Sequence, residues 1–231
     1  MKNIILLNLV ILFVTSAYGQ RKVEATFKIH SEHKISFNFK FAGDIKVVQW
    51  DKQEVKVNAN VLVDDGKGND DYSLKSEETP EEFRIISDFG DYFERKNTNG
   101  INNSNTKTEI SYVIYVPENC KLRIKSITGN VFSENFSGIL ETDLIAGDVE
   151  LKQYHGELLL KTISGDLDVT MNKADIEAKT VTGTIYSDLE INLPNSSKSN
   201  SNTNKVIGTV NNGGERVKLE TISGNIYMRK G

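Results

Sequence analysis

Glycine recurs every nine residues, or at a multiple of nine, through the second half of this chain, and that spacing limits what it can fold into. Ala174 fills the one gap in the series, and Cys120 stands one step before it. The series is Gly129, Gly138, Gly147, Gly156, Gly165 and Gly183, and the frame returns at Glu215 and Gly224. A fixed period indicates a repeat architecture. A periodic glycine marks a turn where φ is positive or another backbone lies close.

Apolar residues occupy fixed places between the glycines. The second residue after each repeat position is always aliphatic, and the fourth is never charged. The seventh is mostly apolar, as in Ile127, Ile145, Ile163 and Val181. Apolar residues two apart indicate β-strands. We expect the second, fourth and seventh places to face inward, which requires a change of parity, and hence a bend, within each frame.

Two all-β architectures fit this pattern. An antiparallel meander suits the Gly-Asp and Gly-Asn pairs, which favour tight hairpin turns, and predicts clean alternation. A β-solenoid instead stacks nonapeptide strand repeats, two frames per 18-residue rung, with rungs about 4.8 Å apart. The change of parity favours the solenoid, with Cys120 as a small buried residue at one corner. No segment after the first nineteen residues has a good helical period.

Three segments are predicted. Residues 1–19 form a signal peptide, residues 20–116 an N-terminal β-strand region with polar loops, and residues 117–231 the β-repeat region, interrupted by a polar loop at 195–205. Further polar insertions at 64–71 and 97–106 are expected to be mobile loops. The strand-like runs that precede the repeat are 34–41, 44–48, 55–63, 83–86 and 108–116.

The first residues have the pattern of a secretory signal. Lys2 precedes an apolar run from Ile4 to Val14, and small residues follow up to Gly19. The run is too short to cross the roughly 30 Å hydrocarbon layer as a helix. We therefore expect cleavage near Gly19, export to the periplasm or the cell surface, and no transmembrane anchor.

Composition argues against several classes of function. With 32 acidic and 28 basic residues the chain has a net charge of −4, which gives no reason to expect nucleic-acid binding. A single cysteine cannot form an internal disulfide, so burial and backbone hydrogen bonds must hold the fold. We expect no cofactor.

No catalytic motif is present in the sequence. His30, His33 and His155 do not form a metal-binding spacing and are interpreted as solvated surface residues. Nucleophile elbows, phosphate loops and Cys/His signatures are absent from the sequence. We expect no enzyme activity. A β-helix that modifies polysaccharides is the enzymatic alternative.

Two sets of outward residues are candidate contacts. Stacked rungs would gather four acids into a weak candidate cation patch, for which oxygen-rich Ca²⁺ binding is one interpretation and a solvated face the favoured one: Asp148, Glu150, Asp166 and Asp168. Phe132 and Tyr186 lie in the frames on either side of these acids and are speculative ligand contacts. Packing beneath the N-terminal strands or the loops is the favoured alternative for these two rings.

The order of these motifs resembles a known family. The segments AGDIKVVQW (42–50) and YVIYVPENCKLRIKSITGNV (112–131) are followed by AGDVEL, SGDLDV, TGTIYS and SGNIYM. This order is similar to the bacterial DUF4097 family, labelled as adhesins and also described as head-GIN-domain-like proteins. The resemblance extends from about Ile35 to the C-terminus. It implies a repetitive β-fold and an envelope or surface location, and it implies no catalytic residues.

The sequence as a whole favours a non-catalytic, exported binding module. Its partner would be an unidentified protein or glycan, contacted through many regularly spaced side chains. A periplasmic structural protein that associates weakly with itself through its solenoid ends is the alternative.

Overall fold

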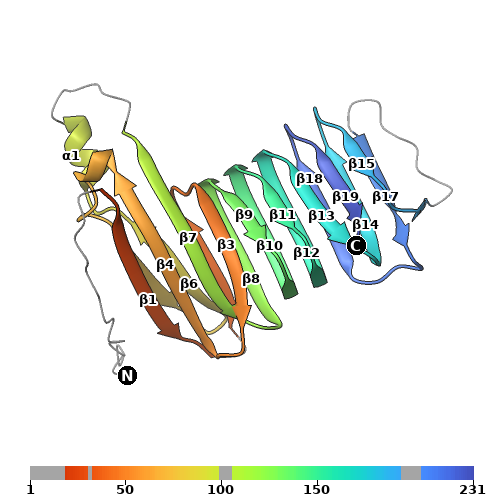
Figure 1. Ribbon diagram of the computed structural model, residues 1–231, viewed down its shortest axis with the longest axis horizontal. Coiled ribbons are helices and arrows are strands. Elements are labelled where there is room, and N and C mark those ends of the chain that lie inside the picture. The colour runs from red at the N-terminus through yellow and green to blue at the C-terminus, as the bar shows by residue number, and fades with distance from the viewer. Residues whose placement is uncertain (1–18, 31–32, 99–105, 194–203) are drawn as a thin grey trace.

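The computed structural model describes residues 19–30, 33–98, 106–193 and 204–231, and these fold almost entirely as β-strands (Figure 1). The all-β class is therefore confirmed. The predicted signal peptide and most of the predicted loop at 195–205 lie outside the described residues. In the part of the chain that the structure describes, no helix combines the length and apolar character needed to cross a membrane.

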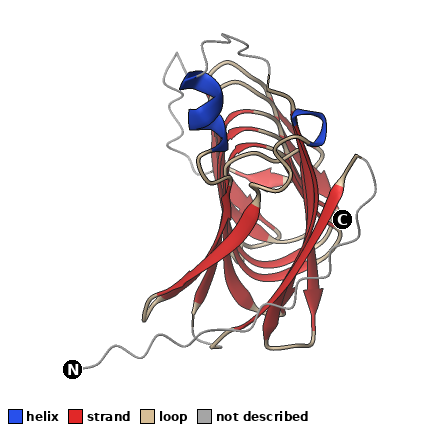
Figure 2. Cartoon of the chain, turned by 90° about the vertical axis from the view of Figure 1, so that its left-hand side faces the viewer, coloured by secondary structure: helices blue, strands red, loops and turns tan. Residues whose placement is uncertain are grey.

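The strands form two open sheets, which face each other across a shared interior (Figure 2). Sheet A has the order β1 (Arg21–Lys28), β4 (Glu54–Val63), β7 (Thr108–Pro117), β3 (Asp44–Trp50), β9 (Asn130–Ser133), β11 (Val149–Leu151), β13 (Leu167–Met171), β19 (Ile226–Lys230), β15 (Ile185–Ser187). Sheet B has the order β16 (Ile191–Asn192), β17 (Asn204–Val210), β14 (Ala174–Thr180), β18 (Arg216–Thr221), β12 (Tyr154–Ser164), β10 (Phe136–Ala146), β8 (Cys120–Thr128), β2 (Lys34–Phe39), β6 (Glu82–Asp88), β5 (Ser73–Glu78).

The central strands pair in parallel with a constant offset. Cys120 lies beside Gly138 and Gly138 beside Gly156 in sheet B, while Val131 lies beside Val149 in sheet A. Each partner is 18 residues further along the chain. The chain thus runs along one strand of sheet B, turns, runs along one strand of sheet A, and returns beside its own starting point. Parallel pairing excludes an antiparallel meander for these strands.

The last strands of the chain do not lie at the end of the stack. Strand β18 lies between β12 and β14, so that Val217 has Leu158 on one side and Ile176 on the other. In the same way β19 separates β13 from β15. At the other end, β2 and β3 lie beside β8 and β9. The spatial order of the rungs therefore differs from their order in the sequence.

The repeated glycines stack directly on one another at the corners. A Cβ added at Gly147 would lie 2.1 Å from the carbonyl oxygen of Gly129, and one added at Gly156 would lie 2.0 Å from that of Gly138. Gly147 also has a φ of +148°, which L side chains rarely adopt. Only a residue without a side chain permits this approach.

The expected parity change is wrong for the strands of sheet B. Their alternation continues to the end of the strand, so that the sixth place is buried and the seventh is outward. Thr162 is buried, whereas Ile163 is 42% exposed. The inward hydroxyl is satisfied, because Thr162 Oγ1 donates to the carbonyl oxygen of Gly147 at 3.0 Å. After β9 of sheet A the seventh place does turn inward, and Phe136 is fully buried, whereas Asn172, the seventh place after β13, is exposed.

The N-terminal region also differs from expectation in four places. Strands β1 and β5 form where the sequence indicated none. The segment predicted as a mobile loop at 64–71 is a structured turn, in which the side-chain oxygen of Asn69 accepts from the amide of Val63 at 2.8 Å. Helix α1 (Tyr92–Thr98) forms although the sequence lacks helical periodicity, since Lys96 and Tyr92 both bond Asp64 and tie the helix to that turn.

Replacing a stacked glycine should cost more than replacing an unstacked one. Gly147→Ala combines an unfavourable φ with a clash against backbone, whereas Gly90 has a φ of +53° and no atom near an added Cβ. We expect Gly147→Ala to lower the free energy of unfolding by roughly 2 kcal/mol more than Gly90→Ala. Urea titration measures both. Equal losses would mean that the close approach is unimportant.

The intercalated C-terminal strands should be protected from hydrogen exchange. Chain ends usually fray, but β18 and β19 have a hydrogen-bonded neighbour on each side. We expect their amides to exchange as slowly as those of β12 and β13, and more slowly than those of the edge strands β15 and β16. Fast exchange throughout 216–230 would contradict the observed strand order.

Candidate binding faces

The residues that follow Gly129, Gly147, Gly165 and Gly224 form a ladder of side chains. Asp148 Oδ1 accepts from the backbone amide of Asp166 at 2.8 Å, and Asp166 Oδ1 accepts from that of Asn225 at 2.6 Å. Asn130 Oδ1 accepts from the amide of Asp148 at 3.0 Å, and Asn225 Oδ1 from that of Thr184 at 3.0 Å. The short Asp or Asn side chain at each of these positions thus joins one corner to the backbone of the next. Asp148 and Asp166 therefore have a structural role.

The other two acids lie side by side on the outer face of sheet A. Glu150 pairs in register with Asp168. Arg229 binds Asp168 through two nitrogens, with Nε–Oδ1 at 2.7 Å and Nη2–Oδ2 at 2.6 Å. This pair raises the pKa of the Arg229 guanidinium above its usual range. Lys152 Nζ lies 4.0 Å from Glu150 and 3.7 Å from Glu134.

These contacts give the four acids of the predicted patch different surroundings. Asp148 and Asp166 are turned toward corner amides, and Asp168 is occupied by a residue from the intercalated strand β19. Among the described residues, no group of three or more His, Cys, Asp or Glu side chains could hold a metal ion. The acids instead form part of a face with mixed and locally balanced charge.

Aromatic rings flank this charged region on the same face. The ring of Phe132 is approached by Lys46 Nζ at 5.9 Å and by Lys152 Nζ at 5.2 Å. Tyr186 is 50% exposed and stacks on Tyr227, with centroids 5.1 Å apart and planes 8° apart. Both predicted rings are thus on the outer face, and the structure adds Tyr227. The sequence contained a signal for Tyr227, because it stands three residues after Gly224, as Tyr186 stands three residues after Gly183.

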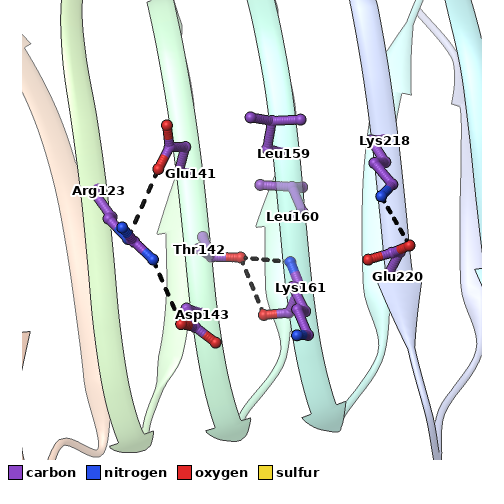
Figure 3. Close-up of a pocket in the computed structure, with 9 residues that line it drawn as sticks. All are labelled: Arg123, Glu141, Thr142, Asp143, Leu159, Leu160, Lys161, Lys218 and Glu220. Atoms are coloured by element: carbon purple, nitrogen blue, oxygen red, sulfur yellow. Dashed lines mark hydrogen bonds and ion pairs between the residues drawn. The ribbon is translucent and has the colours of Figure 1, made fainter.

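The outer face of sheet B carries a shallow groove of about 250 Å³ between β10 and its neighbours (Figure 3). Arg123 lies between Glu141 and Asp143, with nitrogen–oxygen distances of 3.7 and 3.6 Å. Lys34 Nζ also binds Glu141, at 2.6 Å. Leu159 lines the groove among these charges. The groove is therefore shallow and closely paired in charge.

One histidine differs from its predicted role. The side chain of His33 is only 11% exposed, and its Nδ1 lies 3.5 Å from Glu78 Oε1. The ring of His30 packs edge-on against it at 5.4 Å. His33 is thus largely buried rather than solvated, while His155 is exposed as expected. Strand β6 lies beside the start of β2, and Glu78 at the end of β5 reaches the ring of His33.

Comparison with known proteins gives one family match and two solved structures. Residues 118–229 match the family described as Toastrack DUF4097. A solved structure of a "putative cell adhesion protein" from Clostridium sporogenes ATCC 15579 is similar at a TM-score of 0.55 and 13% identity, covering 91% of this chain and 100% of that one. A "putative lipid binding protein" from Parabacteroides distasonis ATCC 8503 gives a TM-score of 0.22 and 10% identity, covering 92% and 97%. No curated protein sequence matches.

Substitutions at Asp166 should separate a structural from a cation-binding role. Asp166→Ala leaves the amide of Asn225 without its acceptor, and we expect it to lower the free energy of unfolding by about 1 kcal/mol. Asp166→Asn keeps an oxygen in place, as Asn130 and Asn225 do, and should change stability by less than about 0.5 kcal/mol. Urea titrations with and without Ca²⁺ measure both. Stabilisation of the unmodified protein by Ca²⁺ that Asp166→Asn abolishes would support the cation site instead.

Proposed function

Residues 118–229 match the DUF4097 (Toastrack) family, and on this basis we propose that the protein is an exported, non-catalytic adhesin-type binding module. Its body is a β-solenoid with two nine-residue frames per 18-residue rung. The parallel registers of 18 residues and the stacked corner glycines support that description.

The observation that carries the proposal is the row of outward side chains on sheet A. Residues in the same place of successive rungs lie side by side, about 4.8 Å apart. This row runs through Lys46, Phe132, Glu150, Asp168, Tyr227 and Tyr186. It places Phe132 on one side of the acids Glu150 and Asp168, and Tyr227 and Tyr186 on the other. Aromatic and arginine side chains are enriched where proteins contact partners.

The mechanism would be contact at many weak points. A flat face with regularly spaced side chains can meet a repetitive partner, such as an envelope glycan or a surface protein, at several places at once. Rigidity helps, because little conformational entropy is lost when the contacts form. The similarity to a structure described as a cell adhesion protein points in the same direction.

The partners of three of the four acids weigh against the polysaccharide-modifying alternative. Asp148 and Asp166 accept backbone hydrogen bonds from the next rung, and Asp168 is bound by Arg229. A general acid or base must be within reach of substrate and free to exchange a proton. These three side chains would first have to release partners that hold the rungs together.

An adhesion assay on intact cells tests this proposal. Cells that produce the protein should bind a surface coated with envelope polysaccharide or host matrix protein more strongly than cells that lack it. The variant with Phe132→Ser, Tyr186→Ser and Tyr227→Ser should lose most of the difference, since each of these outward rings contributes about 1 kcal/mol. Ile207→Ser, which removes an exposed apolar residue from the outer face of sheet B, is the matched control.

Protease treatment of the same cells shows where the protein lies. Degradation while a periplasmic marker survives is expected for a surface module. Full protection of the protein, with release on osmotic shock, would eliminate the adhesin and leave a periplasmic binding or structural role.

A further inference from the structure

A continuous apolar ridge follows one corner of the stack. We call it the isoleucine stripe, and its exposed fractions are 39, 51, 42, 47 and 40% in spatial order: Ile127, Ile145, Ile163, Ile222 and Val181. Neighbouring backbone contacts establish this order. The backbone amide of Ser223 donates to the carbonyl oxygen of Ile163 at 2.8 Å, and the backbone amide of Thr182 donates to that of Ile222 at 2.9 Å. The stripe therefore includes the intercalated C-terminal rung.

At this corner the aliphatic side chain faces the solvent and the polar side chain is buried, which is the reverse of the usual arrangement. Single exposed apolar residues need no explanation, but contiguous ones mark interaction surfaces. At each rung of the stripe the residue just before the exposed aliphatic is buried, and in four of the five it carries a hydroxyl: Ser126, Leu144, Thr162, Thr221 and Thr180. The inward hydroxyls donate to carbonyl oxygens at the corner, from Thr162 to Gly147, from Thr221 to Gly165 and from Thr180 to Gly224. The aliphatic groups are thus presented outward at every rung.

A row of charges runs beside the stripe, two residues before each aliphatic position. In spatial order its signs alternate along the stack: Lys125, Asp143, Lys161, Glu220 and Lys179. Asp143 lies 3.9 Å from Lys125, and Glu220 bonds Lys218 at 3.0 Å. Lys161 is exposed and has no ion-pair partner within the described ranges. An alternating row is a pattern that a second, reversed copy can complement.

We propose that the isoleucine stripe is the contact surface of a symmetric dimer of this protein. A two-fold axis that lies in the contact plane and runs across the stripe places stripe on stripe. The same axis places each charge row opposite the other copy's row in reverse order. A closed two-fold contact of this kind uses one patch of each subunit.

The charge row selects the register of the two copies. Overlap of all five rungs would oppose Lys125 with Lys179, Asp143 with Glu220, and Lys161 with itself. Overlap of four rungs opposes unlike charges throughout, in either direction of shift. One shift pairs Asp143 with Lys161 and Lys125 with Glu220. The other pairs Lys161 with Glu220 and Asp143 with Lys179. Like charges in contact are strongly disfavoured, so the dimer is offset by one rung.

The size of the surface predicts a weak dimer. Four rungs span about 14 Å, and the stripe with its charge row is only a few residues wide. That is below the roughly 800 Å² per partner of standard interfaces, so the dimer should form at micromolar or higher concentrations. The outer face of sheet A stays free. The inference stands independently of the proposed adhesin role, although two copies would double the number of contacts with a repetitive partner.

Sedimentation equilibrium tests the dimer, with the protein purified in the form that the cell produces. Over about 10 μM to about 1 mM we expect a reversible monomer–dimer equilibrium. Ile145→Lys should weaken it at least tenfold. Ile207→Lys, a like change at a 42% exposed isoleucine in β17 away from the stripe, should leave it unchanged. A strict monomer at the highest concentration, or equal effects of both variants, would overturn the proposal.

Charge reversal tests the register separately. Lys161→Glu should weaken the dimer by several-fold, because both registers oppose Lys161 with an acid. Adding Asp143→Lys should restore affinity in one register, and adding Glu220→Lys should restore it in the other. Circular dichroism of each variant checks that it is folded. If neither second substitution restores the dimer, the two-fold arrangement is wrong.

Discussion

Contact between backbone and backbone at the corners is the constraint on which the rest of this structure depends. Gly129, Gly147, Gly165, Gly224 and Gly183 lie in one column, each so close to the next that a methyl group would not fit. The ladder of Asp and Asn side chains beside them joins the same rungs by hydrogen bonds. Together these contacts hold successive rungs at one spacing and in one register. Straight rows of side chains on both faces follow, because equivalent residues are then carried to equivalent places.

This regularity changes the meaning of the surface residues. Acids that would look like a ligand-binding cluster in an irregular protein are here an intrinsic part of the repeat, since Asp148 and Asp166 each serve the corner of the next rung. The features that the repeat does not require are the ones that suggest function. They are the aromatic rings of the sheet A row and the outward aliphatics of the isoleucine stripe.

Much of the fold follows from local patterning. The nine-residue glycine spacing indicates short strands and tight corners, and the offset of 18 residues between neighbours is contained in the same numbers. The predicted inward and outward positions are wrong where the length of the strand decides which way a side chain faces. The strands of sheet B run on through the seventh place and keep their alternation, so Ile127 and Ile145 face outward. The shorter strands of sheet A end earlier, so Phe136 faces inward. The sequence pattern combines the frames of sheet A and sheet B, so it cannot show in which of them the seventh place faces inward.

The sequence by itself determined the β-class, the corner residues and the period, because these depend on backbone freedom and side-chain alternation within a few residues. The tertiary structure alone decided the order of the rungs. Frames with the same local pattern offer nearly equivalent hydrogen bonds and apolar contacts, so nothing near Val217 indicates that it lies between Leu158 and Ile176. That placement depends on pairing between strands far apart in the chain. It also decides the site, since it brings Arg229 to Asp168, Tyr227 to Tyr186 and Ile222 into the stripe.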